Sequence, residues 1–243
     1  SDGAVTVTLY ENGALGGDAE LTESCIAGSV DFIVGMTGSL VNYIPEAALF
    51  DLPNVFPDLE TAREVLDGPI LAELQAAYEA GGLKLFGYAD SGFRVMTSSK
   101  AVRQMSDFSG IKIRTMENQV HIAFWKAMGA DATPMSWGEA YTALQQGALD
   151  GQENPATVIL TNNVAQVNNH LAMTEHAYST VFLVMSPETW ASFDDETKET
   201  FKRVMAECSI EERELSRKMD SEAVAELEKQ GMTVTYPDKQ QFI

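Results

Sequence analysis

Residues 110–155 read GIKIRTMENQVHIAFWKAMGADATPMSWGEAYTALQQGALDGQENP, and this stretch decides the fold class. Apolar and polar residues alternate over 111–114, which is the period of a half-buried strand. Arg114 therefore lies at a strand end. Helical spacing follows over 120–128, and Gly129 is a plausible stop.

The rest of the stretch repeats the same unit. Residues 132–135 predict a second short strand, and Ser136 with Glu139 three residues later predicts a capping box that opens a second helix. Residues 148–154 then return as a third strand. Alternating strands and helices predict an α/β fold with a parallel sheet, in which the carboxyl ends of the strands line a ligand-binding crevice.

Three side chains at the ends of these units are candidates for ligand contact. The planar charged fork of Arg114 suits bidentate capture of a carboxylate. Trp137 and Asn154 offer an aromatic face and an amide. Each also has a simpler interpretation, in which Arg114 neutralises an acidic side chain, Trp137 fills core, and Asn154 caps the helix that begins at Pro155.

Composition excludes several classes of protein. The chain has 243 residues, enough for one large or two modest domains, and its net charge of −20 makes nucleic-acid binding improbable. No apolar run reaches the roughly 18 residues of a membrane span, so we expect no direct membrane insertion. The negative field repels anions at long range, so anion binding has to rest on local positive groups.

No pattern predicts catalysis, a metal site or a cofactor. Cys25 and Cys208 lack metal or redox spacing, and both lie in helical patterns that favour buried free thiols, with a disulfide left open. The three histidines have no neighbouring nucleophile motif. His121, at the start of its helix, is the histidine that could face a cleft. The loop after residues 30–34, with Met36 and Thr37 at its start, could face a polar ligand.

The remaining elements are expected as follows. Strands are predicted at 5–9, 30–34, 83–88, 93–97, 171–176, 178–185 and 232–236, helices at 59–66, 70–80 and 194–230 and from Asp18 to Gly28, and a turn at 12–17. The apolar stripe of the long helix is predicted to be Phe201, Val204, Met205 and Cys208. Ser91 and Gly92, between two predicted strands, give a hinge its dihedral freedom, and a plain turn would look identical.

Several motifs together resemble a known family. KIRT, TPMSWGEAYTALQQGALDGQENP, ENGALGGDAELTESCIAGSVDF and SGFRVMTSS are similar, in order and spacing, to the DctP-type solute-binding subunits of tripartite ATP-independent periplasmic (TRAP) transporters. The resemblance implies a two-lobed periplasmic-binding-protein-like fold that closes on an organic acid. It also implies that Arg114 pairs with the ligand carboxylate, that Arg94 is a second arginine, and that Trp137 and Asn154 are the pocket aromatic and amide.

The chain departs from the family pattern in two ways. Family members usually have a strand and helix before the segment that opens this chain and continue beyond its last residue, so the chain is expected to be truncated at both ends. Met36 and Thr37 stand where sialic-acid-type members place an acidic residue, which argues against a sialic-acid-like ligand.

The resemblance sets the overall expectation. We expect the protein to be an extracytoplasmic, periplasmic receptor, not an enzyme, that delivers a sugar acid, dicarboxylate or similar acid to a TRAP membrane permease. Lobe I would comprise 1–91 and 180–219, and lobe II 92–179 and 220–243. The expected ligand-binding residues are Arg114, Arg94, Trp137, Asn154, Thr37, Met36 and His121. The alternatives are an α/β enzyme acting on a small organic acid and a purely structural partner module.

Overall fold

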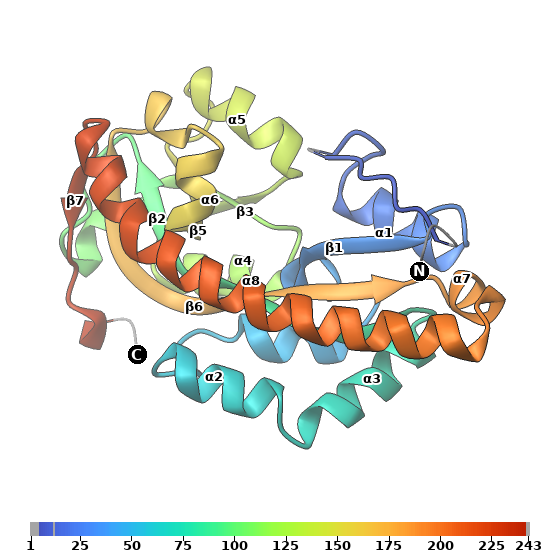
Figure 1. Ribbon diagram of the computed structural model, residues 1–243. Helices are drawn as coiled ribbons and strands as arrows, with labels where there is room; N and C mark the ends of the chain where they lie inside the picture. The colour runs from blue at the N-terminus through green and yellow to red at the C-terminus, as the bar shows by residue number, and fades with distance from the viewer. Residues whose placement is uncertain (1–4, 12, 242–243) are drawn as a thin grey trace.

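A computed structural model describes residues 5–11 and 13–241, whose strands form one mixed sheet (Figure 1). The strands are β1 (Phe32–Met36), β2 (Lys84–Ser98), β3 (Lys112–Thr115), β4 (Asp131–Pro134), β5 (Gly151–Pro155), β6 (His170–Met185) and β7 (Thr233–Thr235). Their order is β1-β6-β2-β5-β3-β4, with β7 beside β6. The expected α/β class is therefore confirmed.

The helices follow the sequence pattern closely. They are α1 (Asp18–Ile26), α2 (Leu59–Leu66), α3 (Ile70–Ala80), α4 (Gln119–Ala127), α5 (Trp137–Gln145), α6 (Ala156–Thr161), α7 (Pro187–Ser192) and α8 (Asp195–Lys229), with short 3₁₀ turns η1 (Thr37–Ser39), η2 (Pro45–Asp51), η3 (Met105–Phe108), η4 (Val164–Gln166) and η5 (Lys239–Gln241). Asp58, Asn118 and Asp194 cap α2, α4 and α8 through their side chains. Within the described ranges, no helix is both long and apolar enough to cross a membrane.

The expectation of a parallel sheet is only partly correct. β3 pairs in parallel with β4 and β5, and β7 pairs in parallel with β6, but the pairs β1–β6, β2–β6 and β2–β5 are antiparallel. The parallel pairs are those joined through a helix. The antiparallel pairs involve the long strands, whose direction local periodicity does not reveal.

Two pairs of short predicted strands are each one long strand. β2 has 15 residues and β6 has 16, and the two run antiparallel along their length. Bulges interrupt the register of the two strands, and one of them lies at Gly92, where φ is +98°. In β6, the backbone of Glu175 also has a positive φ, of 43°. The predicted hinge at Ser91–Gly92 is therefore a bulge within a continuous strand, since a bulge absorbs an extra residue without ending the pairing.

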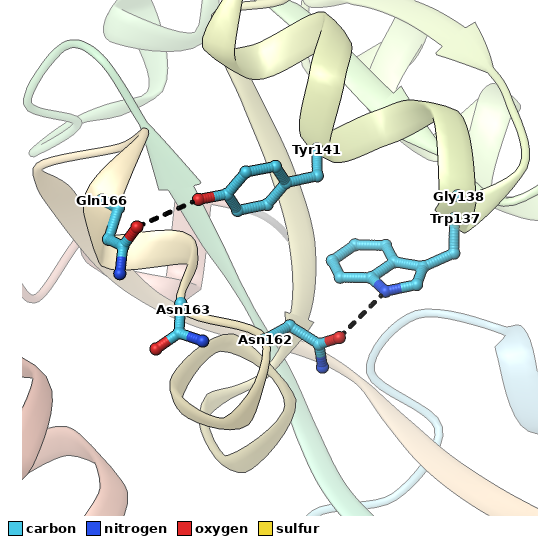
Figure 2. Close-up of a pocket in the computed structure, with 6 residues that line it drawn as sticks. All are labelled: Trp137, Gly138, Tyr141, Asn162, Asn163 and Gln166. Carbon is cyan, nitrogen blue, oxygen red and sulfur yellow. Dashed lines mark hydrogen bonds between the residues drawn. The ribbon is translucent and has the colours of Figure 1, made fainter. Parts of the chain in front are cut away.

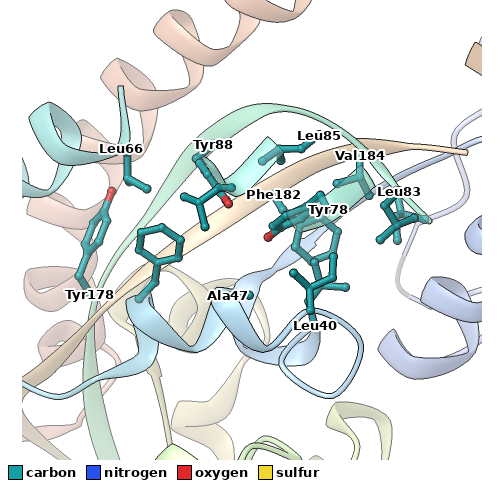
Figure 3. Packing of buried hydrophobic residues seen from close by; sticks show 14 of the residues in the cluster. Leu40, Ala47, Leu66, Tyr78, Leu83, Leu85, Tyr88, Tyr178, Phe182 and Val184 are labelled. Atoms are coloured by element: carbon teal, nitrogen blue, oxygen red, sulfur yellow. The ribbon is translucent and has the colours of Figure 1, made fainter. Parts of the chain in front are cut away.

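The buried apolar side chains form three clusters. The first packs η2, α2 and α3 beneath β2 and β6, as Figure 3 shows for Tyr78, Tyr88 and Phe182. The second cluster includes residues of β3, β4 and α4, and the third includes residues of α6 and of the end of α8. β2 and β6 contribute residues to all three. The lobe boundaries proposed from the sequence stay a prediction.

Several local predictions are wrong. Residues 5–9 form no strand with the described part of the chain, and Val7 and Leu9 are 81% and 74% exposed because no neighbouring strand covers them. The predicted turn at 12–17, by contrast, is confirmed over residues 13–15, and its first residue, Asn12, lies outside the described residues. β1 begins two residues later than expected. Ser136 is the N-cap residue of α5, as expected, but the predicted capping box does not form, because its hydroxyl donates to the Glu139 carboxylate (2.7 Å).

The long helix is confirmed, but its buried face is not the predicted one. α8 runs along β2 (Figure 1), and its buried residues are Ala223 and Leu227, near its end. Phe201 packs against Phe32 and Phe86, whereas Cys208 is exposed. Cys25 is buried, so the expectation of two buried thiols holds for one of them, and both cysteines are free.

Candidate functional site

A cavity of about 960 Å³ opens between α1 and its preceding loop, the ends of β1 and β3, and the start of α5. Its lining includes Arg114, Met135 and Trp137, together with Asp18 and Asn42. Two of the seven expected ligand-binding residues, Arg114 and Trp137, line it. The cavity thus draws on segments far apart in the sequence.

Arg114 is a buried cation at the cavity wall. It is 4% exposed, and its Nε donates to the Met135 carbonyl (2.9 Å). Burial lowers the pKa of Arg114 to about 10; the negative charge of Glu153 opposes this effect, and the positive charge of Arg94 adds to it. Among the described residues it forms no ion pair, so its charge lacks a carboxylate at contact distance. Such a group binds an incoming carboxylate strongly.

Trp137 forms the aromatic side of the same wall. The Arg114 guanidinium carbon lies 5.4 Å from the centre of its ring, within cation–π range. Its indole Nε1 donates to Asn162 Oδ1 (3.2 Å), as Figure 2 shows. A smaller hollow of about 350 Å³ lies beside it, lined also by Tyr141 and Gln166. The bond to Asn162 fixes the indole at the boundary between the two cavities.

Arg94 is buried in β2 and its charge is already paired. It is 1% exposed, and its Nε and Nη2 donate to the Glu153 carboxylate at 2.5 and 2.9 Å. Nη2 also donates to Asn154 Oδ1 (3.1 Å), and Nη1 to Ser179 Oγ (3.1 Å). All three guanidinium nitrogens therefore have partners. Arg94 does not line the larger cavity.

Glu153 is the centre of a buried polar network. Its carboxylate lies 3.2 Å from His176 Nε2 and 3.5 Å from His121 Nδ1. Burial alone would raise the pKa of Glu153, but the charges of Arg94 and His121 hold it well below its usual value. Burial likewise opposes a charged His121, yet Glu153 and Asp51, 3.1 Å from Nε2, raise the pKa of His121. Burial lowers the pKa of His176.

The remaining expected residues surround this network. Asn154 Nδ2 donates to Gln152 Oε1 (2.7 Å), and the residue lies in β5, not at a helix cap. Met36 Sδ lies 3.5 Å from Arg94 Nη1. Thr37 Oγ1 accepts a hydrogen bond from Thr180 (3.0 Å). The structure thus joins Arg94, Asn154, Met36 and His121 in or around one buried network, next to the Arg114–Trp137 pair, with Thr37 bonded separately.

Sequence reasoning missed Asp51, Asp18, Glu117 and Asn162. Asp51 bonds to His121 and Asn118, and the other three line the cavity. Their positions depend on contacts between distant segments, for which local spacing gives no signal. Glu153, within the GQENP motif, was likewise not expected in the site. In the described part of the chain, no group of three His, Cys, Asp or Glu side chains could hold a metal ion.

Comparison with known proteins gives consistent matches. A solute-binding protein of Verminephrobacter eiseniae is 38% identical over 99% of this chain and 72% of its own length. The crystal structure of a TRAP periplasmic solute-binding protein from Polaromonas sp. JS666, bound to D-erythronate, is 39% identical with a TM-score of 0.92, covering 95% of this chain and 77% of the other. The sugar acid binding protein DctPAm from Advenella mimigardefordensis, in complex with galactonate, is 33% identical with a TM-score of 0.96, covering 99% and 78%.

These similarities confirm the two-lobed binding-protein fold expected from the sequence. The family is one of periplasmic solute receptors. The model of the bacterial extracellular solute-binding proteins of family 7, DctP, matches residues 1–243. The chain therefore belongs to the bacterial extracellular solute-binding proteins of family 7.

Proposed function

We propose that this chain is an extracytoplasmic receptor that binds a carboxylate-bearing organic acid and delivers it to a TRAP membrane permease. The observation that supports this most is Arg114, a buried guanidinium at the wall of a 960 Å³ cavity, without an ion pair among the described residues. A ligand carboxylate would supply the missing charge. The ligands of related structures, D-erythronate and galactonate, are acids of this kind.

Four of the expected residues have distinct roles in this proposal. Arg114 forms the main ion pair, and Trp137 packs on the body of the ligand while holding the guanidinium in place. A buried hydrogen-bonded network of Arg94, Glu153 and Asn154 lies behind these two side chains. Closure of the lobes on the ligand would remove water from the ion pair between Arg114 and the ligand carboxylate, and the ion pair would become stronger.

A thermal-shift screen of organic acids, followed by calorimetry on the best hit, tests the proposal. The panel contains D-erythronate, galactonate, glucuronate, succinate and pyruvate, with the uncharged erythritol as a control for the carboxylate. We expect a saturable rise in melting temperature with at least one acid and none with erythritol. No shift with any acid, or an equal shift with erythritol, would contradict a carboxylate receptor.

The fate of the ligand distinguishes a receptor from an enzyme. A receptor returns its ligand unchanged, so the NMR spectrum of the best-binding acid should remain constant after overnight incubation with equimolar protein. New resonances that grow with protein concentration would support the enzyme alternative instead. Delivery to a permease is tested by uptake of the same acid in cells with and without the receptor gene.

A further inference from the structure

The smaller hollow beside Trp137, of about 350 Å³, is lined by aromatic rings and amides. Its lining residues are Trp137, Gly138 and Tyr141 of α5 and Asn162, Asn163 and Gln166 of the segment that follows α6. Among the described residues, no charged side chain lines it, whereas Arg114 and several acids line the larger cavity. Its volume is at the lower end of the roughly 300–1,000 Å³ of small-molecule sites. The hollow is therefore suited to a small ligand without charge.

The two aromatic rings form one side of the hollow. Trp137 and Tyr141 are four residues apart on α5, so their side chains leave the same face of the helix. Each ring is held by a hydrogen bond to the opposite segment (Figure 2): the indole Nε1 donates to Asn162 Oδ1 (3.2 Å), and the Tyr141 hydroxyl donates to Gln166 Oε1 (3.4 Å). Because the rings are fixed before any ligand arrives, they offer an apolar surface at little cost in entropy.

The amides on the other side of the hollow have hydrogen-bonding atoms to spare. Within the described part of the chain, the Asn163 side chain forms no hydrogen bond, and Gln166 uses its side-chain oxygen but not its Nε2. An amide has both donor and acceptor atoms, so it complements hydroxyl groups, which also donate and accept. A carboxylate only accepts, and it would find no cation among the described lining residues.

Gly138 leaves space open beside the indole. A Cβ on this residue would meet no described atom within 4 Å, and its φ lies outside the left-handed region. Glycine is a poor helix former, yet neither the backbone nor a close neighbour requires it at this position of α5. Together with Trp137 and Asn162, Gly138 lines both cavities, so the hollow adjoins the larger cavity beside the indole.

From these features we propose that the hollow binds an uncharged pyranose ring. The C–H face of the sugar packs on Trp137 and Tyr141, and its hydroxyl groups exchange hydrogen bonds with Asn163 and Gln166. Such a ring has two possible sources. One is a free sugar. The other, which rests on the proposed function, is the second ring of a glycosylated sugar acid whose carboxylate pairs with Arg114 in the adjoining cavity.

NMR of the ¹⁵N-labelled protein tests the free sugar. The chain has three tryptophans, and the indole N–H resonance of Trp137 is assigned from its loss in Trp137→Phe. Titration with the methyl pyranosides of glucose, galactose and mannose should move this resonance saturably with at least one of them. Sorbitol is an open-chain polyol without a flat C–H face for the rings, so it should not move the resonance.

Two variants assign the binding to the hollow. Tyr141→Ala removes one ring, and Asn163→Gly removes the spare amide while suiting the left-handed backbone there, where φ is 55°. Each should weaken glycoside binding by about three- to tenfold, the value of one aromatic contact or one hydrogen bond. Tyr236→Ala, at a tyrosine that is 73% exposed and outside the hollow, should leave the affinity unchanged.

Calorimetry with gluconate and lactobionate tests the glycosylated acid, because lactobionate is gluconate that carries a galactose ring. If the hollow takes this second ring, lactobionate should bind at least about fivefold more tightly than gluconate. Tyr141→Ala should remove this gain without weakening gluconate, since Tyr141 does not line the larger cavity. A glycoside shift without the gain would assign the hollow to a free sugar.

The proposal is wrong if no glycoside moves the Trp137 resonance saturably and lactobionate gains nothing over gluconate. It is also wrong if these effects persist undiminished in both Tyr141→Ala and Asn163→Gly. The glycoside titration needs no acid, so it tests the hollow even if no acid binds and the proposed function fails. Conversely, gluconate binding without any effect of the second ring or of the glycosides would leave the receptor function intact.

Discussion

Replacing Arg114 by alanine is the most direct test of the site. The guanidinium is 4% exposed and has no ion pair among the described residues, so a ligand carboxylate would be buried against it. Removing one partner of such a pair leaves the other charge unpaired, which typically costs about 2 to 5 kcal/mol. That range corresponds to a loss of affinity of roughly 30- to 5,000-fold. Because the guanidinium itself is buried, we expect a loss within this range.

Calorimetry on the best acid from the screen measures the effect. Arg114→Lys keeps the charge and loses the planar fork, so it should lose about 1.5 kcal/mol, the value of one hydrogen bond to a charged group. Arg203→Ala removes an exposed arginine of α8 and serves as the control. Binding by Arg114→Ala within tenfold of the parent would refute the reasoning, provided its circular dichroism spectrum and urea midpoint show a folded protein.

The other predictions concern the buried network and the thiols. Glu153→Gln leaves Arg94 buried without its ion pair, so urea unfolding should show a loss of about 3 to 5 kcal/mol, against almost none for Glu207→Gln; a loss below 1 kcal/mol would count against the network. The pKa of His121 is raised in the folded state, so its stabilising charge is present below the unfolded value of 6.5 and lost as pH rises through the folded pKa. His121→Gln should therefore destabilise the protein more at low than at high pH, and an equal loss at both would contradict this. Cys208 should react with a thiol reagent in the native protein, whereas Cys25, whose pKa burial raises to about 12, should react only after unfolding; simultaneous labelling of both would be the opposing result.

Much of the fold could be predicted from local patterns. The helices α2 and α3 begin and end where they were predicted, at 59–66 and 70–80, and β3 follows from the alternation before Arg114. The long strands could not be predicted as single elements. Gly92 resembles a turn residue in sequence, and only the continuous pairing of β2 with β6 makes it a bulge.

The site was predictable only in its individual residues. Arg114 and Trp137 were named from strand-end and helix-start positions and from the family resemblance, and they line one cavity. The pairing of Arg94 with Glu153 joins residues 59 positions apart, and Asp18 and Glu117, which line the cavity, come from separate segments. These contacts arise from tertiary packing, so residue spacing along the chain carries no information about them.

The two long strands have a consequence for how the molecule can be cut or bent. β2 and β6 each supply side chains to all three apolar clusters, so no exposed tether separates one cluster from the others. A protease that nicks a surface loop should leave the fragments associated through backbone hydrogen bonds, and native gel filtration should still return one peak. Any rocking of one part against the other has to be absorbed as flexing along the strands themselves, at irregular points such as Gly92 and Glu175.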